Sequence, residues 1–156
     1  MEDVISMCKA RATEAMERFL CVLSFVPEHK VNWSPAPTAK SALQIAAHCA
    51  GYGGAFAPVI RDGTFPRVEE FLGPIQATIE SIETLDQAEA VLRKGIADTL
   101  AALDAVKPEQ MGATVLTPIG PQPFAFFLDI PARHLFAHTA QIDYLQTCWG
   151  DMEVHF

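Results

Sequence analysis

The chain has 156 residues, of which 50% are apolar and 19% charged, and its formal net charge is −8. Half apolar is too rich a composition for a disordered chain, and the length suits a single domain over residues 1–156 with its own hydrophobic core. A surface this acidic repels phosphate backbones, which argues against nucleic acid as the main partner. The mean hydropathy of +0.18 is high for a small monomer and is compatible with a homodimer interface.

Two charge-free stretches, residues 41–60 and 110–128, need to be considered as membrane spans. Glycines and prolines interrupt both, so neither is an unbroken apolar run of about 20 residues, the length that a span needs. The acidic residues near the N-terminus and the lack of a basic segment before an apolar run argue against a signal peptide. Four cysteines without a CxxC pair are typical of free thiols in a reducing compartment. We therefore expect a cytoplasmic protein without membrane association.

The first half of the chain predicts two helices. Apolar residues recur at alternating three- and four-residue steps over residues 5–26, which is the pattern of an amphipathic helix that Pro27 ends. A proline-rich connector follows, and either Thr38 or Ser41 can cap a second helix that runs to about Ala57.

A long connection and a third helix come next. Residues 61–83 mix turn signals with short apolar runs and predict a connection that contains some helix of its own. Thr84 followed by Gln87 is a capping box, and helical spacing of apolar residues then continues until Pro108. Residues 111–123 combine β-branched residues with prolines and glycines, which predicts a short extended loop or hairpin.

The last predicted helix lies between Phe124 and Trp149, before Gly150. Pro131 lies inside this stretch, so the helix is either kinked there or begins there. Four helical segments and little strand predict an all-α bundle. A connection of the length of residues 61–83 can cross the bundle and leave the second and third helices parallel.

The last helix carries the strongest chemical signal. His134 and His138 lie one turn apart, so their Cβ atoms are about 5–6 Å apart and both imidazoles can hold one cation. The competing interpretation is a chance pair, with one histidine in the core and the other on the surface. Alternating four- and three-residue spacing predicts one face directed at the bundle interior, made of Phe127, Pro131, His134, His138, Gln141, Leu145 and Cys148. Leu135 stands where the zinc-protease HExxH motif has glutamate, so that motif is excluded.

His48 is the candidate for a third ligand, because it shares a face of the second helix with other core-like residues. Three imidazoles with open coordination positions are typical of a catalytic rather than a structural metal site. Gln44, Tyr52 and Gln141 each lie about one turn from one of these histidines and are candidate hydrogen-bonding groups, or else ordinary helix residues. The adjacent Cys49 points elsewhere and is expected to pack. No acidic residue lies on the histidine face, although three in the connection could fold over the site, namely Asp62, Glu69 and Glu70.

An ordered set of motifs resembles the DinB/YfiT-like superfamily. It consists of the tryptophan-proline connector at residues 32–37, the run from Ser41 to His48, the Pro-Ile-Gly-Pro loop at 118–121, the segment from His134 to Ile142, and Trp149-Gly150. One departure concerns the residues after the second histidine of the last helix. Many members read His-Arg-Gly-Gln there, whereas this chain has His138-Thr139-Ala140-Gln141.

The resemblance implies a four-helix bundle in up-down-down-up order, with a long crossover between helices two and three. It implies a divalent metal, usually nickel or zinc, held by His48, His134 and His138, and often a homodimer. Where activity is known, it implies a transferase or isomerase that uses a low-molecular-weight thiol and a small electrophilic substrate. Imidazole ligands alone suit nickel, zinc, copper and iron equally.

Three hypotheses remain open. In the first, the chain is a metal-dependent enzyme, an S-transferase or a hydrolase, in which the metal lowers the pKa of a bound thiol or water. In the second, it is a non-catalytic, stress-associated bundle whose metal is structural or adventitious and whose apolar surface binds a partner. In the third, the histidines are ordinary core residues that bind no metal. The sequence does not identify catalytic residues.

Overall fold

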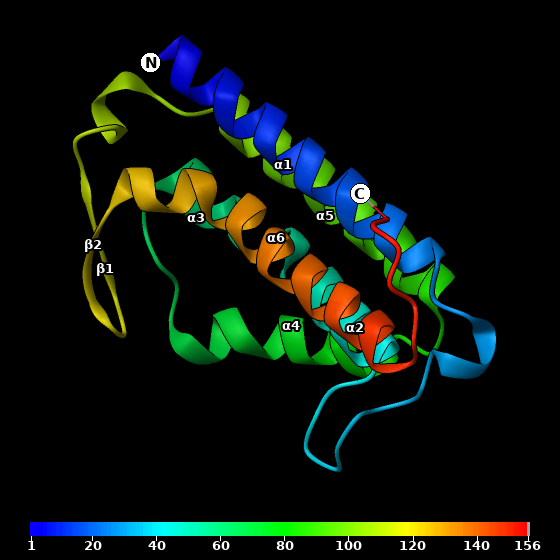
Figure 1. Cartoon of the computed structure of the whole chain (residues 1–156). Helices are drawn as coiled ribbons and strands as arrows, with labels where there is room; N and C mark the ends of the chain where they lie inside the picture. Colours follow the sequence, from blue (N-terminus) through cyan, green and yellow to red (C-terminus); the bar gives the residue numbers. More distant parts are fainter. Residues whose placement is uncertain (156) are drawn as a thin grey trace.

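The computed structural model describes residues 1–155 and is an all-α bundle with one small hairpin (Figure 1). Four long helices form the bundle: α1 (Glu2–Ser24), α2 (Ala42–Gly53), α5 (Leu85–Asp104) and α6 (Phe124–Cys148). α1 packs mainly against α6, and α2 packs mainly against α5. Helices α2 and α5 run in the same direction, opposite to α1 and α6, which is the predicted up-down-down-up order (Figure 1).

The crossover between α2 and α5 contains two further helices, α3 (Ala57–Asp62) and α4 (Val68–Ser81). α4 carries the chain back along the bundle and packs against α2 (Figure 1). This confirms the prediction of a long connection with helix of its own, and it places α4 beside the side of α2 that carries Gln44, His48 and Gly51.

Local capping signals set where two of the bundle helices begin. The backbone N–H of Gln87 donates to Oγ1 of Thr84 at 3.2 Å, so the predicted capping box starts α5. At the start of α2 the cap is Ser41 rather than Thr38, because the N–H of Gln44 donates to the Ser41 Oγ at 3.3 Å.

The second helix is shorter than predicted: it ends at Gly53 instead of about Ala57. The cause is close packing of α2 on α5. A Cβ atom on Gly95 of α5 would lie only 2.6 Å from the backbone N of Gly54, so the two backbones meet there without side chains between them. The chain turns after this contact and resumes as α3.

Short 3-10 turns and one hairpin complete the fold. The turns are η1 (Glu28–Lys30) and η2 (Pro108–Gln110), and the hairpin pairs β1 (Thr114–Thr117) with β2 (Gly120–Pro123). The strands are antiparallel, with Thr117 opposite Gly120 at the turn, where Gly120 has a φ of 104°. The hairpin predicted for residues 111–123 is therefore present.

The last helix starts at Phe124 and runs through Pro131. Of the two predicted possibilities, a helix that begins at Pro131 is therefore wrong, and the proline lies inside the helix. The face predicted to point inward is partly wrong. His134 and His138 lie at the edge of the core, and Gln141 and Cys148 are exposed, whereas Gln146 is buried and donates from Nε2 to the carbonyl of Val22 at 3.1 Å. The buried face is the line one residue along, which keeps the same spacing and consists of Leu128, Ala132, Leu135, Thr139, Ile142 and Gln146. The predicted line therefore runs along the edge of the core, about 100° of helix rotation away from its centre.

The connector before α2 is tied to the end of α6. The rings of Trp33 and Trp149 meet edge to face with centroids 5.7 Å apart. Both tryptophans belong to the motifs that resemble the DinB/YfiT-like superfamily. Their contact anchors the connector, which leads to Lys40 and Ser41, to the end of α6. Among residues 1–155, no helix combines the length and apolar character that a membrane span requires.

Candidate metal centre

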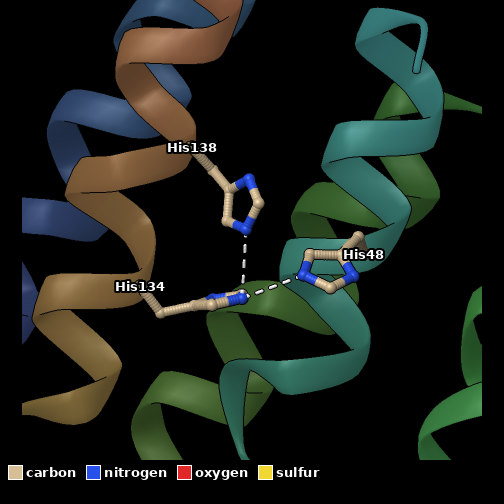
Figure 2. A group of neighbouring side chains, drawn as sticks. All are labelled: His48, His134 and His138. Carbon is tan, nitrogen blue, oxygen red and sulfur yellow. Dashed lines mark hydrogen bonds between the residues drawn. The ribbon is translucent and has the colours of Figure 1, made fainter. Parts of the chain in front are cut away.

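His48 of α2 and the pair His134 and His138 of α6 form one cluster, although they are far apart in sequence (Figure 2). The Nε2 atom of His134 lies 3.0 Å from Nε2 of His48 and 3.2 Å from Nε2 of His138. One nitrogen of each ring lies within 4.8 Å of the other two. The three rings therefore direct their Nε2 atoms toward one point between the two helices.

Burial keeps these rings neutral. Desolvation, followed by the neighbouring His138 and Lys40, lowers the pKa of His48 from 6.5 to about 4. Desolvation and the two other histidines lower the pKa of His134 to about 3. The pKa of His138 is also lowered, mainly by burial, although its hydrogen bond to Gln141 acts in the opposite direction. All three imidazoles are therefore in the form that binds metals near neutral pH.

The cluster fits a divalent metal. Imidazole nitrogens that share a tetrahedral zinc ion at about 2.0 Å are spaced about 3.3 Å apart, close to the two separations that His134 makes. Within residues 1–155 the cluster offers three neutral nitrogen donors and no further protein ligand, which would leave coordination positions open on a metal, as in catalytic sites. Cys49 is fully buried on another face of α2, where burial raises the pKa of its thiol, so it packs as predicted.

Gln141 is the predicted hydrogen-bonding residue that contacts a histidine of the cluster directly. Nδ1 of His138 donates to Oε1 of Gln141 at 2.7 Å. Because the proton is held on Nδ1, the lone pair of Nε2 faces the cluster. The contact thus sets both the orientation and the tautomer of this ring.

Tyr52 and Gln44 lie beside the cluster in different ways. The Tyr52 ring lies 4.7 Å from the ring of His48 and 5.3 Å from that of His134, centroid to centroid, and so covers one side of the cluster. The Gln44 side chain accepts a hydrogen bond from the Ser41 backbone N–H at 2.9 Å as part of the α2 cap. Gln44 therefore has a structural role at the helix start while it also lines the hollow beside His48.

The acidic residues that could have folded over the site do not join it. Asp62 pairs with Arg61, and Glu70 pairs with Arg67. Among the described residues, the group of side chains that could hold a metal at this place contains the three histidines and neither these two acids nor Glu69. The connection does cover the site, but α4 brings Gln76 and Ile79 to it.

Two open hollows flank the cluster. One, of about 600 Å³, lies beside His48 between α2, α4 and the segment before α2. The other, of about 440 Å³, lies beside His138 and Gln141 on α6. Lys40 lines both. Sequence reasoning missed Lys40 and Gln76, although Lys40 is visible as the charged residue directly before the charge-free stretch of α2.

A third cavity, of about 300 Å³, lies toward the hairpin and contains no titratable side chain. It is closed by aromatic and aliphatic side chains of α4, α6 and neighbouring segments, among them Phe56, Phe65, Phe71, Phe126, Phe127 and Ile130. Ile130 precedes His134 by one helical turn, so this apolar cavity and the hollow beside His138 lie in opposite directions from the cluster along α6.

The chain matches a known family over most of its length. The model of the DinB superfamily matches residues 11–142, a range that includes all three histidines. No curated protein sequence matches the chain.

Solved structures share the fold at low identity. A protein from Streptococcus pneumoniae is 12% identical, with a TM-score of 0.70 over 92% of this chain and 90% of that one. A DinB-like protein from Bacillus subtilis is 19% identical, with a TM-score of 0.65 over 99% and 96% of the two chains. A mycothiol-dependent maleylpyruvate isomerase is 16% identical, with a TM-score of 0.68 over 88% of this chain and 60% of that longer protein.

Proposed function

The chain belongs to the DinB superfamily, and we propose that it is a metal-dependent enzyme in which His48, His134 and His138 hold a divalent transition metal. The observation that carries the proposal is the meeting of three neutral Nε2 atoms beside two open hollows. Without a cation, one proton on Nε2 of His134 would have to serve the lone pairs of both His48 and His138, whereas a metal binds all three nitrogens.

The metal we expect is nickel or zinc, as in the family that the sequence resembles. When bound, it would supply a Lewis acid that lowers the pKa of a thiol or of water. The chain's own residues would then orient and enclose the reactants. Gln141 holds the His138 ring, Tyr52 covers one side of the cluster, and the hollows beside His48 and His138 leave space for small molecules.

Within this class we favour a thiol-dependent S-transferase that joins a low-molecular-weight thiol to a small electrophilic substrate. The support is twofold: one structural neighbour is named as a mycothiol-dependent isomerase, and a thiolate is a good nucleophile toward soft electrophiles. The two hollows provide separate spaces for a thiol and an electrophile on either side of the histidines.

The alternative is a non-catalytic, stress-associated bundle that binds a metal or a partner protein. Its support is the hairpin, where Leu116 is 77% and Ile119 is 82% exposed. Such a protein would use the metal to fold, and its site would be closed by further ligands. We also propose that the protein is a homodimer, which light scattering can measure. Its cytoplasmic location stays a prediction from the sequence.

Metal content tests the proposal. Tag-free wild-type protein and the His48→Ala/His138→Ala variant are each reconstituted with nickel or zinc, and bound metal is measured by elemental mass spectrometry. We expect about one metal per chain in the wild type and almost none in the double variant. His29→Ala removes an exposed histidine outside the cluster and should retain the metal. A wild type that stays free of metal after reconstitution would contradict the proposal.

A further inference from the structure

Lys40 is a charged residue beside the histidine cluster. Together with Thr38 and Ala39, it lines the hollow next to His48 and also the hollow next to His138, and it carries the charge among these three residues. It lies at the end of the connector, directly before the cap of α2. The contact between Trp33 and Trp149 anchors that connector to α6.

The Lys40 ammonium group has no charged or hydrogen-bonding partner in the described part of the chain. Within residues 1–155, its side chain makes no ion pair and no hydrogen bond, whereas Lys9 and Lys94 pair with Asp104 and Asp98. The residues that line the two hollows include no aspartate and no glutamate. Lys40 is therefore the charged residue that the two hollows share, and an anion bound in either of them would meet no carboxylate.

The electrostatic field around Lys40 also favours an anionic ligand. Lys40 is near enough to His48 and His138 to lower the pKa of both rings. The hollow beside His48 also faces the first turn of α2, where the positive end of the helix dipole lies. A metal would add further positive charge. The site is therefore positive within an acidic surface, and such a field attracts anions.

We propose that Lys40 is a specificity-determining residue that binds the carboxylate of a small anionic reactant next to the histidine cluster. The proposal rests on the proposed function, because it places that reactant at the same site. The hollows of about 600 Å³ and 440 Å³ have the size of small-molecule sites. The carboxylate belongs either to the thiol or to the electrophile.

Calorimetric titration of the metal-loaded protein tests the role of Lys40. The probes are mercaptosuccinate, an anionic thiol; 2-mercaptoethanol, a neutral thiol; and fumarate, an anionic electrophile. Each is titrated into the wild type, Lys40→Gln and Lys94→Gln. The last variant removes one positive charge from an exposed ion pair on α5 and so controls for the change in net charge.

We expect at least one of the two anionic probes to bind Lys40→Gln about three- to tenfold more weakly than the wild type, the loss expected for a partly exposed charged contact. Binding to Lys94→Gln and binding of 2-mercaptoethanol should not change. A Lys40 dependence for mercaptosuccinate alone assigns the carboxylate to the thiol, and one for fumarate alone assigns it to the electrophile. Equal binding of both anions to the wild type and Lys40→Gln, or no binding of either, overturns the proposal.

The metal content of the same samples separates this proposal from the proposed function. If the wild type holds no metal, the proposed function fails. Fumarate titrated into the metal-free protein then still tests the role of Lys40, because a contact between a carboxylate and lysine needs no metal. If metal is bound but no anion depends on Lys40, the Lys40 proposal alone fails.

Discussion

His138 donates from Nδ1 to Oε1 of Gln141 at 2.7 Å, three residues further along the same helix. Helix geometry brings side chains at this spacing together, so the contact requires no long-range packing. It fixes which nitrogen of His138 carries the proton and directs Nε2 at His134, 3.2 Å away. A local contact on the exposed side of α6 thus orients one ring of the histidine cluster.

Replacing Gln141 should weaken metal binding without unfolding the bundle. In Gln141→Leu the ring of His138 loses its acceptor, so it can rotate and can place its proton on Nε2. We expect the metal affinity to fall about 10- to 100-fold, the usual effect of losing such a partner. Competition with a chromophoric chelator measures the affinity, and circular dichroism checks the helix content.

Gln141→Glu is the matched control, because a carboxylate also accepts the Nδ1 proton. This variant should bind metal at least as tightly as the wild type. If Gln141→Leu keeps wild-type affinity, the hydrogen bond does not prepare the ligand, and Gln141 is an ordinary surface residue of α6.

The parts of the fold that local chemistry determines could be predicted from the sequence. The Thr84–Gln87 capping box and the antiparallel hairpin are both where the residues place them. The end of α2 could not be predicted, because it depends on backbone contact between Gly54 and Gly95, which are distant in sequence. The buried role of Gln146 was missed for the same reason: its partner is the carbonyl of Val22 on α1.

The grouping of the three histidines was predictable from the sequence, but the surroundings of the cluster were not. His134 and His138 share a helix face by spacing alone, and the structure brings His48 to them. Their position at the edge of the core could not be predicted, because the neighbouring line through Leu135 and Ile142 has the same spacing and is the one that faces the core. Lys40 and Gln76 reach the site through the connector and α4, whose paths the sequence does not specify.

The stability of the metal-free protein should fall as the pH falls from about 7 toward 4. The pKa values of His48 and His134 are lowered from 6.5 to about 4 and about 3 in the folded chain. Between these values and 6.5 the unfolded chain binds protons that the folded chain does not. The free energy of unfolding therefore decreases as the pH decreases over this range.

Urea unfolding of chelator-treated protein at pH 7.5 and pH 5 measures this dependence. Carboxylates elsewhere also titrate, so the comparison is with His48→Gln/His134→Gln, which lacks the two rings. We expect the wild type to lose more stability between the two pH values than the variant does. Parallel losses would mean that the two rings take up protons as readily in the folded chain as in the unfolded one.

The contact between α2 and α5 predicts a large loss of stability when Gly95 gains a side chain. A Cβ on Gly95 would lie 2.6 Å from the backbone N of Gly54 and 2.9 Å from the carbonyl carbon of Gly53. Both atoms belong to the backbone, so the strain can be relieved only by moving a helix. We expect Gly95→Ala to lower the free energy of unfolding by about 1–3 kcal/mol or more, the cost of overpacking.

Gly73→Ala in α4 is the control, since a Cβ there meets nothing within 4 Å beyond its chain neighbours. Alanine is the better helix former, but Pro74 follows directly and disfavours the helical conformation of a preceding residue that has a Cβ. The two effects oppose one another, so this variant should stay within about 1 kcal/mol of the wild type. Thermal unfolding of the two variants beside the wild type measures both effects. Because Gly53 and Gly54 directly follow the turn of α2 that carries His48 and Tyr52, a shift of α2 in Gly95→Ala should also weaken metal binding. A Gly95→Ala variant with wild-type stability would show that α2 and α5 can separate without cost, and would contradict this account of where α2 ends.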